Sequence, residues 1–240
     1  MSLLTPSTCL ELLQRTWLEL QIAGSPPTTI AGLVGEGRDL LHYLNAGWVE
    51  LQAEHVDWDF MQVTPGFSLP TVAGQQIYAP TAIPTAADAA VMVGAVGSWK
   101  KDTFRSYLTS AGFPAEICME YYHYDDFRDT YMIGTQRTVQ TQPIAFSILP
   151  NLSIAIQTPL TGYTVIGDYF QAPIEFAADG DVPALPAQYR LMLVYRAMMV
   201  YGLEENAPEV FNQGKSLYLP LHTRLTNSRL PIIRTGGALA

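Results

Sequence analysis

The sequence predicts an α+β fold: a helical bundle built from the N- and C-terminal helices, with an inserted antiparallel β-rich region and an extended C-terminal tail. Three observations lead to this prediction. Apolar residues recur at helical spacing in the first quarter of the chain. A central stretch changes to short β-branched and aromatic runs that Gly and Pro interrupt. An almost wholly apolar helical run follows at residues 186–202, and such a run must be covered on several sides.

These patterns set the expected domain boundaries. Residues 1–59 and 182–228 supply the bundle, residues 60–181 form the β-rich insertion, and residues 229–240 form the tail. The other three helices of such a bundle would surround the apolar run and cover it. The run is too short, and too often interrupted by Arg and Tyr, to span a membrane.

The first two helices have recognisable starts and apolar stripes. Thr8 and Glu11 have the spacing of a capping box, Pro6 offers an alternative start, and Gly24 ends the run. The second helix is expected from about Glu36 to Glu54. Its predicted stripe consists of Leu41, Leu44, Trp48 and Leu51, which leaves Arg38, Asn45, Glu50 and Gln52 off the stripe.

Proline, glycine and asparagine delimit the last two helices. Pro186 suits a first helical turn, and Gly202 suits the position of a C-terminal glycine. Asn206 can cap the final helix, with Glu209 placed to reciprocate. We expect Pro220 to kink or split that helix, because proline removes a backbone hydrogen bond. The apolar face expected for the final helix comprises Val210, Phe211, Gly214, Leu217, Tyr218, Leu221 and Leu225.

Short apolar runs define the strands expected in the insertion. These runs are residues 60–63, 74–78, 90–96, 117–122, 144–149, 153–157 and 164–170. A turn at Pro65-Gly66 would separate the first two runs. Pro150-Asn151 predicts a hairpin, and the last run is expected to extend this hairpin into a three-stranded antiparallel meander. Residues 124–131 are expected to form a short helix with Phe127 and Tyr131 on one face.

Composition and charge narrow the class of protein. The chain has 240 residues, a net charge of −9 and a pI of about 4.8, which argues against strong sequence-independent binding to nucleic acid. Residues 186–240 carry six of the 13 basic residues and only three of the 22 acidic ones, so the body of the chain is acidic. Cys9 and Cys118 are expected to be reduced and largely buried thiols. The N-terminus has no export signal, so we expect synthesis and use in a cytoplasm.

The sequence indicates no catalytic residues, no cofactor site and no metal site. The four histidines, none at the spacing of a helical zinc site, are His42, His55, His123 and His222. Asp125, Asp126 and Asp129 match no calcium loop, and a solvated helix face is the commoner role of such residues. Residues 32–37 are rich in glycine but lack the lysine and hydroxyl residue of a phosphate-binding loop. We therefore expect a protein that is not an enzyme.

The pattern as a whole resembles the head-to-tail adaptor proteins of tailed bacteriophages, which are also called connector or head-completion proteins. The resemblance rests on structural signatures spread over nearly the whole chain, and none of them is catalytic. The matching segments are residues 12–20 with Gly24, 36–48, 57–60, 124–128 with Gly134-Thr135, 149–151, 167–173, 179–181 with Leu185-Pro186, 195–201, and Glu204, Glu205, Ala207 and Pro208.

This resemblance implies a structural virion protein of the neck, made in the host cytoplasm, that forms a ring of usually twelve copies. Its partners would be the portal protein of the capsid, a downstream tail or nozzle protein, and further copies of itself. DNA would pass through the lumen without specific binding, and no membrane would be involved. The C-terminal tail of such adaptors often reaches into the portal. The residues expected to dock there are Arg229, Ile232, Ile233, Arg234 and Leu239.

Two other functions stay open on the sequence alone. A tail-tube or tail-terminator protein would have a similar shape, and a tube protein would polymerise. A small hydrolase or carbohydrate-binding module would instead use a tyrosine-rich β face together with Asp125 and Asp126. The close tyrosines at Tyr121, Tyr122, Tyr124 and Tyr131 most often lie in the core or at the rim of a β domain, but they also suit an interface. Together with the apolar helix and the extended tail, they favour an assembling protein.

Overall fold

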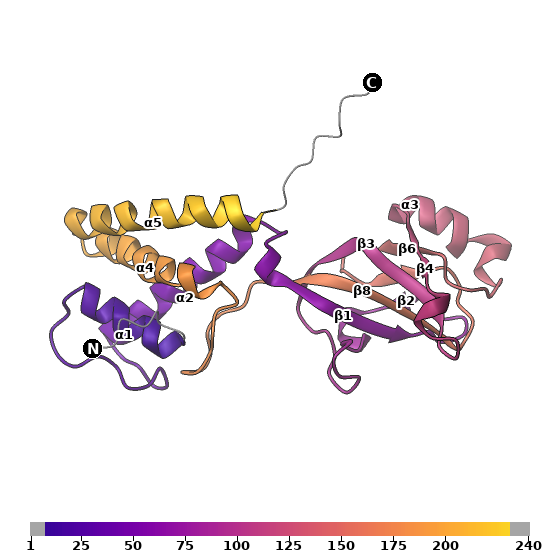
Figure 1. The fold of residues 1–240 in the computed structure, drawn as a ribbon, viewed down its shortest axis with the longest axis horizontal. Helices are drawn as coiled ribbons and strands as arrows, with labels where there is room; N and C mark the ends of the chain where they lie inside the picture. Colours follow the sequence, from indigo (N-terminus) through magenta and orange to yellow (C-terminus); the bar gives the residue numbers. More distant parts are fainter. Residues whose placement is uncertain (1–7, 231–240) are drawn as a thin grey trace, which may run out of the picture. The chain divides into compact units, whose positions relative to one another are not determined.

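The computed structural model describes residues 8–230 and divides them into two compact units (Figure 1). A helical unit combines residues 8–61 with 173–230, and a β-rich unit comprises residues 62–172. The chain therefore leaves the helical unit once and returns to it once. The α+β fold class predicted from the sequence is confirmed.

In the helical unit one apolar helix contacts the three others. The helices are α1 (Cys9–Glu19), α2 (Glu36–Glu54), α4 (Leu191–Glu204) and α5 (Pro208–Arg229). Helix α4 contacts α1, α2 and α5, and Figure 1 shows α4 and α5 running side by side. Met192, Leu193 and Met198 of α4 are almost completely buried. Burial on several sides explains why this run carries so few charged residues.

The two ends predicted for the apolar helix are wrong. Residues Ala187–Tyr189 form a tighter 3-10 turn, in which the Tyr189 N–H donates to the Pro186 carbonyl at 2.8 Å, and α4 begins only at Leu191. Gly202 does not end the helix. It is buried inside α4, where a Cβ atom would lie 2.6 Å from the backbone nitrogen of Phe211. Glycine is needed there because α4 and α5 approach each other so closely.

Helices α1 and α2 follow the sequence pattern closely. The capping box is confirmed: the Glu11 N–H donates to Thr8 Oγ1 at 3.3 Å, and the Thr8 N–H donates to Glu11 Oε2 at 3.1 Å. Helix α1 nevertheless ends at Glu19, before Gly24, and α2 has its predicted bounds. Leu44, Trp48 and Leu51 of the predicted stripe are buried, whereas Leu40 is buried in place of Leu41. Gln52, predicted to lie off the stripe, is buried too.

Gln52 is buried because its side chain binds the backbone of a segment outside α2, a role that an apolar stripe does not predict. Its amide donates to the Ile174 carbonyl at 2.9 Å, and its Oε1 accepts from the Ile174 N–H at 3.2 Å. Asn45, two turns earlier, makes the same pair of bonds with Phe176. Two amide side chains of α2 thus hold an extended segment that carries no strand partner of its own.

The start predicted for the final helix is also wrong. Asn206 has a φ of 50° and stands outside the helix, Ala207 occupies the cap position, and Pro208 is the first helical residue. Helix α5 then continues through Pro220 to Arg229 without splitting. Pro220 is exposed, so the hydrogen bond that it removes lies on the surface of the helix rather than in the core.

The β-rich unit consists of two four-stranded sheets. We call the first the β8 sheet; its order is β1 (Gln62–Pro70), β8 (Tyr163–Gln171), β3 (Val96–Leu108) and β4 (Ile117–Cys118), all antiparallel. The second, the β6 sheet, has the order β2 (Ile77–Tyr78), β7 (Ile154–Ile156), β6 (Ala145–Ile148) and β5 (Glu120–Tyr121), with β5 parallel to β6. Both sheets contribute aromatic residues to one core. The parallel rings of Phe104 and Phe146, 4.1 Å apart, connect them.

Three predictions in this region are wrong. Pro65-Gly66 is not a turn, because β1 passes through it with a register shift between Val63 and Phe67. Residues 90–96 are not a strand: Met92 forms only an isolated bridge with Pro84, and β3 begins at Val96. Strand β8 does not extend the hairpin to a meander, because it pairs with β1 and β3 in the other sheet.

Two other local predictions are confirmed. Strands β6 and β7 form the expected antiparallel hairpin, with Phe146 opposite Ile156. Helix α3 (Tyr124–Phe127) continues into one wider turn, Arg128–Met132, and places the rings of Phe127 and Tyr131 5.2 Å apart. Both cysteines are free thiols. Cys9 is buried as expected, whereas Cys118 is exposed because β4 lies at the edge of its sheet.

Candidate functional site

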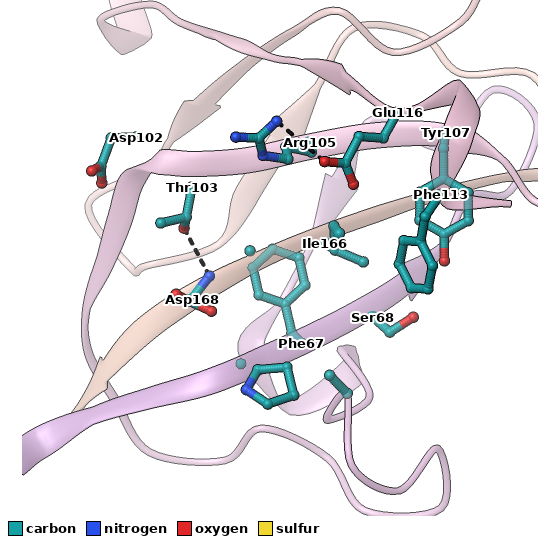
Figure 2. A pocket seen from close by; sticks show the side chains of 14 residues that line it. Phe67, Ser68, Asp102, Thr103, Arg105, Tyr107, Phe113, Glu116, Ile166 and Asp168 are labelled. Atoms are coloured by element: carbon teal, nitrogen blue, oxygen red, sulfur yellow. Dashed lines mark hydrogen bonds and ion pairs between the residues drawn. The ribbon is translucent and has the colours of Figure 1, made fainter.

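A groove with a volume of about 630 Å³ lies in the β-rich unit, over the β8 sheet (Figure 2). Its lining comes from strands β1, β3 and β8 and from the turn after β3. Side chains alternate across a strand, so the inward Phe104, Val165 and Tyr169 fill the core. The intervening residues Arg105 and Ile166 face the groove (Figure 2). The hollow is therefore on the face of the sheet that the core leaves uncovered.

One end of the groove is aromatic. Phe113 lies on the short 3-10 turn Phe113–Ala115 and is 66% exposed, an unusual exposure for a ring of this size. It pairs with the ring of Tyr107 on β3, with the centroids 5.1 Å apart. Ile166 of β8 lies between these rings and the opposite end (Figure 2). This part of the groove can receive an apolar side chain.

The opposite end is acidic. Asp168 of β8 accepts a hydrogen bond from the Thr64 hydroxyl at 3.0 Å and one from the Gln62 amide at 3.3 Å. The Asp168 N–H donates to Thr103 Oγ1 at 2.9 Å, which fixes this residue beside β3. Asp102 is exposed at the same end (Figure 2). Lys100 lies opposite Asp168 in the register of β3 and β8, and its Nζ donates to Gln62 Oε1 at 3.1 Å, so a positive charge stands close to this carboxylate.

One ion pair forms part of the rim. Arg105 Nη1 lies 3.2 Å from Glu116 Oε1, with both side chains partly exposed. This pair joins β3 to the end of the Phe113 turn and cancels one positive against one negative charge. The remaining charged residues that line the groove, Asp102 and Asp168, are both acidic. The groove therefore combines an apolar end with a charged end, where Lys100 lies opposite Asp168.

The end of α5 is the nearest described point to the predicted docking tail. Arg229 is the last residue of α5, and its Nη1 donates to Asp59 Oδ2 at 3.1 Å. Its neighbour Ser228 bonds the Tyr189 hydroxyl at 3.0 Å. Arg229 is thus helical rather than extended. The predicted docking residues Ile232, Ile233, Arg234 and Leu239 lie outside the described residues.

A second hollow, of about 490 Å³, lies between α2 and α5, and hydrogen-bonded side-chain pairs cross it. Arg196 Nη2 lies 2.6 Å from Glu50 Oε2, and His222 Nε2 lies 2.9 Å from Glu54 Oε2. A Cβ atom at Gly47 would be 2.8 Å from Arg196 Cγ, so this glycine lets the arginine lie across α2. These contacts join helices and leave no free charged group for a ligand.

The other residues considered in the sequence do not form a site. Arg128 lies 3.2 Å from Asp129 and 3.9 Å from Asp125, on an exposed helix face. Within residues 8–230, no group of three or more His, Cys, Asp or Glu side chains is placed to hold a metal ion. The hydrogen bond from the Tyr122 hydroxyl to Glu120 helps raise the pKa of Tyr122 to about 12. Burial raises the pKa of the Cys9 thiol to about 12, which keeps it unreactive.

The groove was not predicted from the sequence because strand β3, which forms part of its lining, was not predicted. Its outward residues Thr103, Arg105 and Tyr107 do alternate with the inward Phe104 and Ser106. That alternation is interrupted by register shifts between Val96 and Ser98 and between Lys100 and Arg105. The run Thr103-Phe104-Arg105-Ser106-Tyr107, in which three of five residues are β-branched or aromatic, was the available signal.

Comparison with known proteins identifies a family. The family model for the SU10 adaptor protein matches residues 7–224, which includes both units of the structure. No curated protein sequence matches the chain. None of the helices in residues 8–230 is long and apolar enough to cross a membrane.

Proposed function

Because the chain belongs to the SU10 adaptor protein family, a family of phage head-tail adaptors, we propose that it is a subunit of the ring that joins the capsid portal to the tail. The observation that carries this proposal is the family match over residues 7–224, nearly the whole chain. The protein is a structural component of the virion neck. We propose that it acts without catalysis and that twelve copies form the ring.

The charge of the chain supports free passage of DNA through such a ring. The net charge is −9, and a passage lined with lysine or arginine would bind phosphates through released counterions. An acidic lumen would repel the DNA backbone and let it slide. Assembled rings mixed with short duplex DNA at low salt should show no binding in an electrophoretic mobility assay. Tight binding that weakens steeply with salt would contradict this part of the proposal.

The tail is proposed to make the portal contact. The end of α5 is held by the Arg229–Asp59 and Ser228–Tyr189 contacts, so the residues that follow start from a fixed point of the helical unit. Ile232, Ile233 and Leu239 would supply apolar anchors, and Arg234 a charged contact. The downstream tail or nozzle protein would bind elsewhere on the ring.

Mass measurement tests this function. Purified chain should give a larger complex with its portal protein than alone, as measured by size exclusion with multi-angle light scattering. A chain truncated after Leu230 should fold, because it keeps the buried cores described for residues 8–230, but should fail to join the portal. A full-length chain that stays monomeric and ignores the portal would contradict the proposal. Polymerisation into tubes without the portal would support a tail-tube protein instead.

A further inference from the structure

We propose that Leu4, which lies outside the described residues, inserts its side chain into a small apolar hollow beside the start of α1. The hollow has a volume of about 170 Å³ and belongs to the helical unit, and we call it the Trp48 hollow. Residues 173–184, which we call the return segment, form most of its wall. The contact would hold the return segment against α2. This inference goes beyond the proposed function, because the contact forms within one chain and needs neither a ring nor a portal.

The Trp48 hollow is lined mainly by apolar side chains. Its lining consists of Trp48, Ile174, Glu175, Phe176, Asp181, Val182, Pro183 and Ala184. The rings of Trp48 and Phe176 are buried and stacked, with their centroids 6.0 Å apart, whereas Ile174 is 44% exposed and Val182 is 53% exposed. A cavity of about 150 Å³ can hold a benzene molecule, so this hollow has room for one leucine side chain.

The polar groups of the lining do not call for a polar ligand. Asp181 Oδ2 accepts hydrogen bonds from the N–H groups of Ala177 and Ala178 at 2.6 and 2.8 Å, and these bonds lower the pKa of the Asp181 carboxyl. The other carboxylate of the lining, Glu175, is exposed to water. The hollow therefore suits an uncharged apolar occupant, and residues 1–7 carry no charged side chain.

Chain connectivity identifies the occupant. The Cys9 N–H, in the first turn of α1, donates to the carbonyl of Asp181 at 2.7 Å, and Asp181 is itself part of the lining. Because the first N–H groups of a helix point out of its N-terminus, the residues before Thr8 enter beside the wall of the hollow. Leu4 is four residues from Thr8, and four residues span at most about 14 Å. A segment on so short a tether has an effective concentration in the millimolar range.

The sequence of residues 3–7 suits an extended segment. Pro6 has a fixed φ and disfavours helical backbone at Thr5, so less conformational freedom is lost when the segment docks. Neighbouring side chains of an extended segment point to opposite faces. Leu4 is nearer to the tether than Leu3, so we assign the hollow to Leu4, and Leu3 then points away from it.

The C-terminal tail starts from a different place. Arg229, at the end of α5, donates to Asp59, and Asp59 is not part of the lining that residues 8–230 provide. The tail therefore lacks the direct backbone connection to the wall of the hollow that the residues before Thr8 have. Its isoleucines, Ile232 and Ile233, are nevertheless the competing apolar side chains of the chain and enter the test below.

Hydrogen exchange of the free full-length chain tests the insertion. Leu4→Ser should speed amide exchange in peptides covering residues 174–184 at least about threefold, because the apolar side chain no longer stabilises the wall of the hollow. Leu3→Ser makes the same change at the adjacent position and should leave this exchange unchanged. Equal effects of the two substitutions, or no effect of Leu4→Ser, would overturn the inference.

A double-mutant cycle tests the contact with the wall. Val182→Ser removes an exposed apolar side chain of the lining. Leu4→Ser should have little further effect on the return segment in this background, because two residues in contact do not act additively. Val34→Ser changes a valine that is 81% exposed in the same unit but outside this lining, and Leu4→Ser should keep its full effect there. Additive effects of Leu4→Ser and Val182→Ser would contradict the contact.

Nuclear Overhauser contacts identify the occupant directly. In the free chain, the methyl groups of Leu4 should show contacts to the indole ring of Trp48. Contacts seen only between copies, in a mixture of leucine-labelled and tryptophan-labelled chains, would assign the hollow to a second copy and overturn the inference. Contacts from Ile232 or Ile233 to the same indole would assign it to the C-terminal tail, with the same consequence. Because no portal is present, failure here is distinct from failure of the portal-binding test of the proposed function.

Discussion

The two units of this chain build their hydrophobic cores from different kinds of side chain. The helical unit is built mainly around aliphatic and sulfur-containing residues of α4, and its helices are tied together by the pairs Arg196–Glu50 and His222–Glu54. The β-rich unit is built around the aromatic contacts of Phe67, Trp99 and Phe104, and one face of its β8 sheet stays open as a groove. The ion pairs of the first unit join helix to helix, whereas the Arg105–Glu116 pair of the second lies at the rim of an open groove.

This difference suggests a division of tasks. A unit whose surface charges pair with one another is suited to hold a fixed geometry, and here the Arg229–Asp59 pair holds the end of α5. A unit that keeps the exposed ring of Phe113 beside a groove on one face is suited to bind. Each of the following variants changes one unit and should leave the other as it was.

The largest effect is expected from Phe104→Ala. Phe104 is fully buried and stacks on Phe146 across the two sheets, so its loss should destabilise the β-rich unit by about 3–5 kcal/mol. Hydrogen exchange measured by mass spectrometry in mild urea should show faster exchange in β3, β6 and β8 and little change in α4. Phe113→Ala, which removes an exposed ring from the same unit, is the control. Equal loss of protection in both units would mean that they fold as one.

A somewhat smaller loss of stability is expected in the helical unit from Gly202→Val. Its side chain would meet the Phe211 backbone, since even a Cβ atom lies 2.6 Å from that nitrogen. Forcing α4 and α5 apart should cost about 3 kcal/mol, visible as a lower urea midpoint of the far-ultraviolet circular dichroism. Leu203→Val adds a branched residue at the next, exposed position and should change the midpoint little. An unchanged midpoint in Gly202→Val would show that the helices separate without cost.

An intermediate effect is expected from Gln52→Ala. This change leaves the backbone N–H and carbonyl of Ile174 without the amide that binds them. The two bonds are only partly buried and Ile174 is 44% exposed, so their loss should cost about 0.5–1.5 kcal/mol each. The segment near Ile174 should then exchange its amide hydrogens faster than the rest of the helical unit. Gln213→Ala, an exposed glutamine on α5, is the comparison. Unchanged exchange near Ile174 would mean that Gln52 does not hold this segment.

The smallest effect is expected from Thr8→Ala. Loss of this capping residue should cost about 1 kcal/mol, and the adjacent Cys9 is buried with its thiol pKa raised to about 12. Opening of the first turn should therefore limit labelling of Cys9, and labelling should become about fivefold faster in the variant. The exposed Cys118 of the β-rich unit is an internal control whose rate should stay constant. Equal rates for both thiols in the native protein would contradict the burial of Cys9.

The two units also differ in how much of them the sequence predicts. Helix α2 and the Thr8–Glu11 cap were predicted correctly because their signals lie within a few residues of each other. Strand β8 was located, but its partners β1 and β3 were not, because each is many residues distant and their registers shift. The Pro150-Asn151 hairpin was predicted because its two strands are neighbours in the chain.

The candidate groove could not be predicted for the same reason. Ile166 is more than 50 residues from Tyr107 and Phe113 along the chain and meets them only through the pairing of β3 with β8. The role of Gly202 was misread because a glycine near a helix end looks the same whether it terminates the helix or admits a neighbouring backbone. A glycine that admits a neighbouring backbone can be recognised only when the position of α5 beside α4 is known, and no local sequence pattern gives that position.

Hydrogen exchange of the full-length chain with and without its portal protein tests the division of tasks most directly. We predict that the portal slows exchange in peptides covering residues 222–240, which include the end of α5 and the tail, and leaves peptides covering residues 103–107 and 163–168 of the groove unchanged. Slower exchange in the groove strands, with residues 222–240 unaffected, would contradict the account.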